Sequence, residues 1–132
     1  MKKILTKLIL LWSLNGCASY YHPMHYQTPG GIPIRVDGWL KDHSPNLKYI
    51  DHKLDEIKIC LGTKINIRPQ VHIESGLIYD KETRVYAYTE FNIDSPPRIR
   101  VNESLFQLGH EFIHVLKPEA QHGDQWFTKC DP

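Results

Sequence analysis

The sequence has almost no net charge, and its charged residues form no run of one sign. Its 132 residues include 16 lysines and arginines against 15 acidic residues, which gives a formal net charge of +1. A protein held to nucleic acid by electrostatics usually carries a basic run or stripe, and this sequence has neither. The composition therefore predicts no nucleic-acid partner.

Long apolar runs are missing as well. The apolar run near the start covers residues 8–14 and is interrupted by Ser13. A helix that crosses a bilayer needs about 20 apolar residues, so this run is too short to form one. Because three lysines precede the run, the pattern predicts a signal peptide over residues 1–16.

The end of this segment, LNGC, resembles the lipobox of bacterial lipoproteins, in which a small residue precedes a cysteine that becomes diacylated. The resemblance implies a lipid on Cys17. A tether is expected over residues 17–34, because residues 20–33 contain three prolines and a Gly-Gly pair and show neither helical nor strand periodicity. No aspartate follows Cys17, which favours the outer membrane, facing the periplasm. The alternative interpretation is an ordinary secretory signal that happens to end near a cysteine.

Cysteines are few, and their number is odd. If Cys17 carries lipid, Cys60 and Cys130 are left in an oxidising compartment, where disulfides persist. A bridge between them would close a loop of about 70 residues and stabilise the fold by on the order of 4 kcal/mol. Two buried free thiols are the alternative.

The first predicted element of the domain, which we place at residues 35–132, is a helix. Ser44 is a suitable N-cap, Pro45 suits the first helical position, and Gly62 suits the C-cap. Apolar residues recur between them at helical spacing: Leu47, Ile50, Leu54, Ile57 and Leu61.

After this helix the apolar residues alternate, which predicts short strands. The alternating segments are residues 64–68 with 71–75, residues 84–91 after a turn at 80–83, and residues 98–101. Asn102 can cap a last, buried helix that ends before Pro118, and a short helical tail begins near His122. The expected fold is α+β, with a small, mostly antiparallel sheet of three to four strands.

The last long helix carries the motif HEFIH, in which two histidines stand four residues apart. At that spacing His110 and His114 face the same side of a helix and can reach one metal ion. Glu111 can take a proton from a metal-bound water, whose pKa zinc lowers to about 7. The alternative is a helix whose histidines are satisfied by hydrogen bonds to the sheet.

A catalytic zinc ion needs a third protein ligand and an open position for water. His122 follows the turn and is the preferred candidate, with Asp124 and Glu119 as competitors. Trp126 and Phe127 are expected to pack the tail against the first helix.

A buried HExxH helix, a turn and a histidine-glycine segment with aromatic residues resemble zincin-type metallopeptidases of the SprT-like and related groups. The resemblance implies one Zn²⁺ ion held by His110, His114 and His122, with Glu111 as general base. It also implies hydrolysis of polypeptides aligned by backbone pairing along strand 99–101. The protein is expected to be a monomer.

Two questions stay open at this stage. In zincins a tyrosine often stabilises the oxyanion, and Tyr86 and Tyr88 are of the right type but unassigned. The rivals to a peptidase are a lipoprotein that binds zinc without catalysis and a structural lipoprotein that binds no metal. A Glu111→Gln change distinguishes the first rival, because only a peptidase needs that carboxylate.

Overall fold

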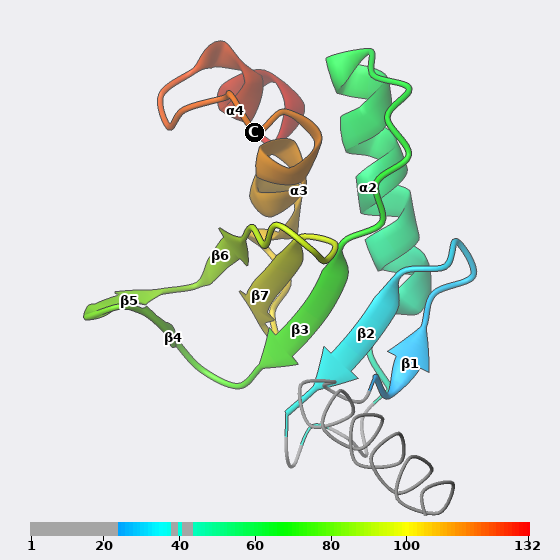
Figure 1. The fold of residues 1–132 in the computed structure, drawn as a ribbon, viewed down its shortest axis with the longest axis vertical. Coiled ribbons are helices and arrows are strands. Elements are labelled where there is room, and N and C mark those ends of the chain that lie inside the picture. The colour runs from blue at the N-terminus through cyan, green and yellow to red at the C-terminus, as the bar shows by residue number, and fades with distance from the viewer. Residues whose placement is uncertain (1–23, 38–39, 41–43) are drawn as a thin grey trace, which may run out of the picture.

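A computed structural model of the protein describes residues 24–37, 40 and 44–132. These residues form a five-stranded mixed sheet, a separate two-stranded sheet and three helices (Figure 1). The α+β class is therefore confirmed. None of these helices is long and apolar enough to cross a membrane. The expected signal peptide and Cys17 lie outside the described residues.

The larger sheet differs from the small, mostly antiparallel sheet of three to four strands that the sequence predicted. Its order is β1 (Tyr26–Gln27), β2 (Pro33–Val36), β3 (Gln70–Glu74), β7 (Arg98–Asn102) and β6 (Ala87–Glu90). The pairings of β3 with β2 and with β7 are parallel, whereas β1 and β6 pair antiparallel to their neighbours. A helix between β2 and β3 carries the chain back along the strand, which makes that pairing parallel.

The expected tether contributes to the folded domain. Residues 26–34 supply β1 and the first half of β2, and Ile32 and Ile34 are 1% and 0% exposed. The hairpin between them closes where the Thr28 hydroxyl accepts a hydrogen bond from the Ile32 N–H at 2.9 Å. The folded part therefore begins before residue 35. The sequence did not reveal this, because short strands around a Gly-Gly turn have the composition of a linker.

Helix α2 (Leu47–Leu61) matches the first predicted helix except at its start. The side chain of Asn46, rather than that of Ser44, caps it by accepting a hydrogen bond from the Tyr49 N–H at 3.0 Å. Gly62 ends the helix in the left-handed conformation, with φ of 65°, as expected of a C-cap glycine. Its buried face consists of Ile50, Leu54 and Ile57.

Two of the predicted strands are shifted or divided. Residues 64–68 form no strand, Ile65 is 44% exposed, and β3 begins only after Pro69. Residues 84–91 divide at Tyr86. The part before it belongs to a hairpin of β4 (Ile78–Asp80) and β5 (Thr83–Val85), and the part after it is β6.

Helix α3 (Leu108–Leu116) begins later than predicted. Asn102 ends β7 instead of capping the helix, and its side-chain oxygen accepts a hydrogen bond from the Ser104 N–H at 2.9 Å. The turn that follows holds Leu105 at a φ of 59°. An asparagine can close a turn of this kind as readily as it can cap a helix, so the residue type does not distinguish the two.

The core lies between one face of the sheet and the helices α2 and α3. Alternate residues of β2, β3 and β7 are buried on that face: Ile34, Val36, Val71, Ile73, Ile99 and Val101. Phe112 of α3 is fully buried against them. Helix α4 (Gln125–Cys130) lies beside α3 (Figure 1), and the Cys60–Cys130 disulfide joins it to α2, with the two Cα atoms 5.6 Å apart. The predicted bridge is confirmed.

The opposite face of the sheet carries a half-buried group of paired charges, which we call the sheet-face network. Its members are Glu74, Tyr88, Glu90, Arg98 and Arg100. Arg100 donates to both carboxylate oxygens of Glu74, with a distance of 2.6 Å from Nη2 to Oε1, and Arg98 donates to Glu90. The hydrogen bonds to Glu74 raise the pKa of Arg100. Each charged side chain of the network is paired with one of opposite sign.

Candidate metal centre

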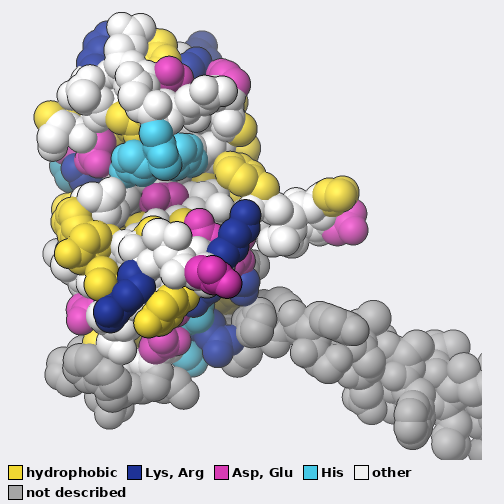
Figure 2. Space-filling model, turned by 90° about the vertical axis from the view of Figure 1, so that its left-hand side faces the viewer, with side chains coloured by type: hydrophobic (Ala, Val, Ile, Leu, Met, Phe, Trp, Pro, Cys, Tyr) yellow, Lys and Arg dark blue, Asp and Glu magenta, His cyan; other side chains and the backbone are white. Residues whose placement is uncertain are grey.

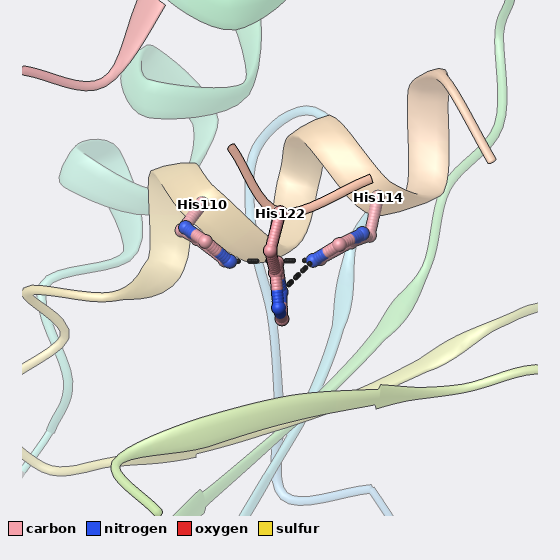
Figure 3. A group of neighbouring side chains, drawn as sticks. All are labelled: His110, His114 and His122. Carbon is pink, nitrogen blue, oxygen red and sulfur yellow. Dashed lines mark hydrogen bonds between the residues drawn. The ribbon is translucent and has the colours of Figure 1, made fainter. Parts of the chain in front are cut away.

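Three histidine side chains converge on one point beside α3. His110 and His114 project from successive turns of the helix, and His122 approaches from the segment between α3 and α4 (Figure 3). Their ligand atoms all lie within 4.8 Å of one another. The Nε2 atom of His114 is 3.2 Å from that of His110 and 2.9 Å from that of His122. We call these three residues the histidine centre.

The chain reverses direction after α3, and this reversal brings His122 back to the helix. Pro118 follows the last turn of α3 and cannot continue the helix. Two tight turns follow, closed by the bonds from the Ala120 N–H to the Lys117 carbonyl at 2.9 Å and from the Asp124 N–H to the Gln121 carbonyl at 3.0 Å.

The two competitors for the third position lie outside the histidine centre. The Asp124 carboxylate accepts a hydrogen bond from the Gln121 N–H at 2.8 Å and so stabilises the turn. The Glu119 carboxylate forms an ion pair with Lys117 at 3.1 Å. The structure thus brings His122, and neither acidic residue, to His110 and His114.

Phe127 supports all three imidazoles from one side. Its ring centroid lies 4.4 Å from that of His110, 4.9 Å from that of His114 and 5.8 Å from that of His122. Only 8% of Phe127 is exposed. The sequence placed this residue in the packing of the tail but gave no sign of its contact with the histidines, because that contact depends on the turn at residues 117–124.

Asp131 fixes the start of the helix that carries the centre. Helix α3 has no side-chain cap of its own at Gln107. Burial raises the pKa of the Asp131 carboxyl, and Lys53 and a hydrogen bond from the His110 N–H partly offset this. The carboxylate lies so close to the backbone that a Cβ on Gly109 would come within 2.3 Å of Oδ1. A carboxylate at this position satisfies a free N–H and interacts favourably with the helix dipole.

Glu111 is buried beside the centre and has one clear partner. It is 5% exposed, and its Oε2 accepts a hydrogen bond of 2.6 Å from the Thr89 hydroxyl. Burial, with a smaller contribution from Asp80, raises the pKa of Glu111 to about 7 against the opposing effect of the hydrogen bond from Thr89. A carboxyl group with such a pKa can accept and release a proton near neutral pH. Thr89 precedes Glu111 by 22 residues, and sequence spacing did not reveal the contact.

Two of the histidines, His110 and His114, have lowered pKa values that favour the neutral form. Burial, together with the adjacent His110 and His122, lowers the pKa of His114 to about 4. Burial and His122 also lower the pKa of His110. Neutral imidazole, with a free lone pair on one nitrogen, is the form that binds metal ions.

The geometry of the centre fits a single zinc ion. The Nε2 atom of His114 faces two other Nε2 atoms, yet it carries either one hydrogen or one lone pair and can satisfy only one of them. A cation at the point of convergence would accept a lone pair from each ring. Tetrahedral zinc with bonds of about 2.0–2.1 Å to nitrogen places its ligand atoms about 3.3 Å apart, close to the distances found here. The three histidines could therefore hold one metal ion and leave a fourth position open.

A cleft of about 530 Å³ opens at the histidine centre. The three histidines and Glu111 line one side, and residues 85–89 with Phe91 line the other. Figure 2 shows the histidine side chains gathered on this face of the molecule, with hydrophobic side chains nearby. The cleft thus has the residues for proton transfer on one wall and a strand on the other.

Neither tyrosine is identified as an oxyanion-stabilising residue, although both line the cleft. The Tyr88 hydroxyl belongs to the sheet-face network, where it donates to Glu90 at 3.1 Å. The Tyr86 ring packs edge-on against Phe106, with centroids 4.9 Å apart.

The strand that borders the cleft is not the one that the sequence indicated. Residues 99–101 belong to β7, which lies inside the sheet between β3 and β6. On this side of the sheet the edge strand is β6, because residues 87–90 pair with the outer side of β7. The expected role of 99–101 as an edge is therefore wrong, and β6 takes that place.

Comparison with protein-family models, with curated proteins and with solved structures finds no match to this chain. The histidine centre and its cleft therefore carry the functional interpretation.

Proposed function

We propose that this protein is a zinc-dependent metallopeptidase that hydrolyses peptide bonds with a metal-activated water. One observation carries the proposal: three converging imidazoles that could hold one ion share a cleft with a buried carboxyl group. The same combination underlies the resemblance to zincin-type, SprT-like peptidases. On that pattern His110, His114 and His122 are the ligands and Glu111 is the general base.

Zinc bound to three histidines would supply a Lewis acid and lower the pKa of the attacking water. Glu111 then accepts the proton of that water as the new C–O bond forms at the scissile carbonyl carbon. It returns the proton to the amide nitrogen as the C–N bond breaks, which releases a carboxyl and an amino end. Thr89 holds the carboxyl group in place through its hydroxyl.

A polypeptide is the substrate class that the cleft supports. Among the residues that the structure describes, β6 pairs only with β7, so the N–H and C=O groups along its outer edge can pair with another extended chain. This edge borders the cleft. Backbone pairing with a sheet edge is a common way of binding peptides and needs no particular side chain.

We further propose that the protein is anchored by a lipid on Cys17 in the bacterial outer membrane, facing the periplasm. The lipobox-like segment LNGC supports this location. The disulfide between Cys60 and Cys130 is consistent with it, because such bonds persist in oxidising compartments.

Metal analysis and proteolysis of the purified full chain test the proposal. We expect about one zinc ion per chain and cleavage of an unfolded protein substrate, with Glu111→Gln retaining zinc but losing activity. Absence of zinc, or equal cleavage by Glu111→Gln, would sink the idea.

A non-catalytic zinc-binding lipoprotein is the second candidate. The favouring observation is that the histidine centre joins α3 to the segment before α4, so that a bound ion would also stabilise the fold. In that case Glu111→Gln leaves function unchanged while chelation lowers the melting temperature. A structural lipoprotein without metal predicts that a chelator has no effect on melting.

A further inference from the structure

The cleft follows the backbone edge of β6 rather than one of its faces. Three consecutive residues of β6, Ala87, Tyr88 and Thr89, line it, as do Tyr86 just before the strand and Val85 at the end of β5. Side chains of a strand alternate between its two faces, so consecutive residues can line one cleft only if the cleft runs along the edge. A chain bound there lies parallel to the strand axis and passes both ends of β6.

Both ends of that edge carry exposed aromatic side chains. Tyr86, just before β6, is 50% exposed and packs against Phe106, which is also 50% exposed. Phe91, just after β6, is 55% exposed. Tyr86 and Phe91 both line the cleft. Adjacent exposed apolar groups beside a polar site are typical of a surface that another molecule covers.

Charge gives the cleft little basis for selection. Apart from the histidines and Glu111, the charged residues that line it are Asp80 and Arg84, one of each sign, on the neighbouring hairpin. Selection among substrates therefore falls to the aromatic residues at the two ends.

The reactive carboxylate lies between these ends. Glu111 accepts a hydrogen bond from Thr89 of β6, and Thr89 lies between Tyr86 and Phe91 in the sequence. An extended chain rises about 3.3 Å per residue, so the five steps from Tyr86 to Phe91 span about 17 Å. A substrate segment of about six residues covers the same length.

We propose that the substrate is an extended polypeptide with apolar side chains at both ends of a segment of about six residues. The segment pairs with the β6 edge, its two apolar side chains pack on Tyr86 with Phe106 and on Phe91, and the cleaved bond lies between them. This inference rests on the proposed function. It adds to it the class of sequence that the cleft selects.

Paired peptides test the inference. One peptide has leucine at both ends of a six-residue segment, the other has serine there, and both are blocked at their termini. With the zinc-loaded full chain we expect kcat/KM to be roughly 10-fold or more higher for the leucine peptide, the scale of selection that an apolar contact gives. Tyr86→Ser combined with Phe91→Ser should bring the two peptides close to equality while the zinc content is unchanged.

Tyr79→Ser is the matched control. Tyr79 is 58% exposed and aromatic, but it does not line the cleft and instead lies under Arg84 at 5.7 Å. This variant should keep the full preference for the leucine peptide. Equal cleavage of both peptides by the unchanged protein overturns the inference but leaves the proposed peptidase function standing.

A binding measurement separates the two proposals if neither peptide is cleaved. Fluorescently labelled peptides are titrated with the zinc-loaded protein. Binding of the leucine peptide that Tyr86→Ser with Phe91→Ser abolishes supports the apolar contacts, and the peptidase function is then decided by cleavage of the unfolded protein substrate. Absence of that binding overturns the inference. Sedimentation tests whether a second copy of the chain occupies the cleft. A dimer that Tyr86→Ser with Phe91→Ser dissociates also overturns the inference.

Discussion

Two polar groups lie on opposite sides of the larger sheet, and their side chains are paired in opposite ways. In the sheet-face network, Arg98 and Arg100 are paired with Glu90 and Glu74. In the histidine centre, three groups of the same kind face one another without an opposing charge among them. The charges of the first group compensate one another, whereas the three histidines of the second could bind a cation.

The shifts in pKa express the same difference. Hydrogen bonding to Glu74 raises the pKa of Arg100 and stabilises its charged form. Burial and the neighbouring imidazoles lower the pKa of His114 to about 4 and favour its neutral form. A polar group that is compensated internally contributes to stability, and one that is not is a candidate for binding and catalysis. The following experiments separate these roles.

The largest expected effect comes from replacing one glutamate in each group. Glu111→Gln should lower kcat/KM by about 10²- to 10⁴-fold, the usual contribution of a general base, with little change in zinc content. Glu74→Gln, in the sheet-face network, should leave kcat/KM within about 2-fold and lower the free energy of unfolding by about 1–2 kcal/mol. Peptidase assays measure kcat/KM, and denaturant unfolding measures the free energy of unfolding. A reversed pattern would contradict the division of roles.

Removing the disulfide should weaken the histidine centre more than the sheet-face network. Cys60→Ser with Cys130→Ser frees a loop of about 70 residues, at a cost on the order of 4 kcal/mol in the free energy of unfolding. Because α4 also carries Phe127 and precedes Asp131, zinc affinity should fall as well. Hydrogen exchange of the backbone should rise first in α4 and only later in β3 and β7. An equal rise in hydrogen exchange in α4 and in β3 and β7 would show that the bridge stabilises the whole fold uniformly.

Zinc should stabilise the chain only through the histidine centre. At a zinc concentration 100 times its Kd, binding adds about 2.7 kcal/mol to the free energy of unfolding. The ligand variant His122→Ala should melt at the same temperature with zinc and with chelator. His52→Ala is the matched control, since His52 lies on the exposed side of α2 and bonds to Glu56 at 3.1 Å. It should respond to zinc as the unchanged protein does.

The smallest expected effect concerns pH. The Thr89 hydroxyl lowers the pKa of Glu111, so Thr89→Val should raise that pKa above its value of about 7. The general base must be ionised, and a higher pKa leaves less carboxylate on the acid side. Activity at pH 6 should therefore fall by about 2- to 10-fold, the equivalent of one hydrogen bond, and recover as the pH rises. If the acid limb of the pH profile of kcat/KM is the same in Thr89→Val as in the unchanged protein, Thr89 does not lower the pKa of the general base.

Spacing within one segment allowed the histidine centre to be predicted. His110 and His114 share a helix face, and His122 is the next histidine after the turn at Pro118, so local geometry alone suggests their convergence. Helix α2 and its C-cap at Gly62 follow from periodicity in the same way.

Contacts between distant segments were not accessible to such reasoning. Periodicity shows which face of a strand is buried, but not which strand lies beside it or in which direction. The parallel pairing of β3 with its neighbours and the edge position of β6 were therefore missed. So was the hydrogen bond from Thr89 to Glu111, which joins an edge strand to a helix.

The Cys60–Cys130 bridge also has a thermodynamic consequence for metal loading. His122 and Cys130 are eight residues apart, and closure of either the metal site or the disulfide favours the same placement of that segment. Two events that favour one conformation are linked, and the linkage is reciprocal. Whatever factor oxidation adds to the affinity for zinc, zinc adds to the resistance of the disulfide to reduction. If the histidine centre holds zinc as proposed, the redox state of the surroundings becomes a determinant of metal occupancy.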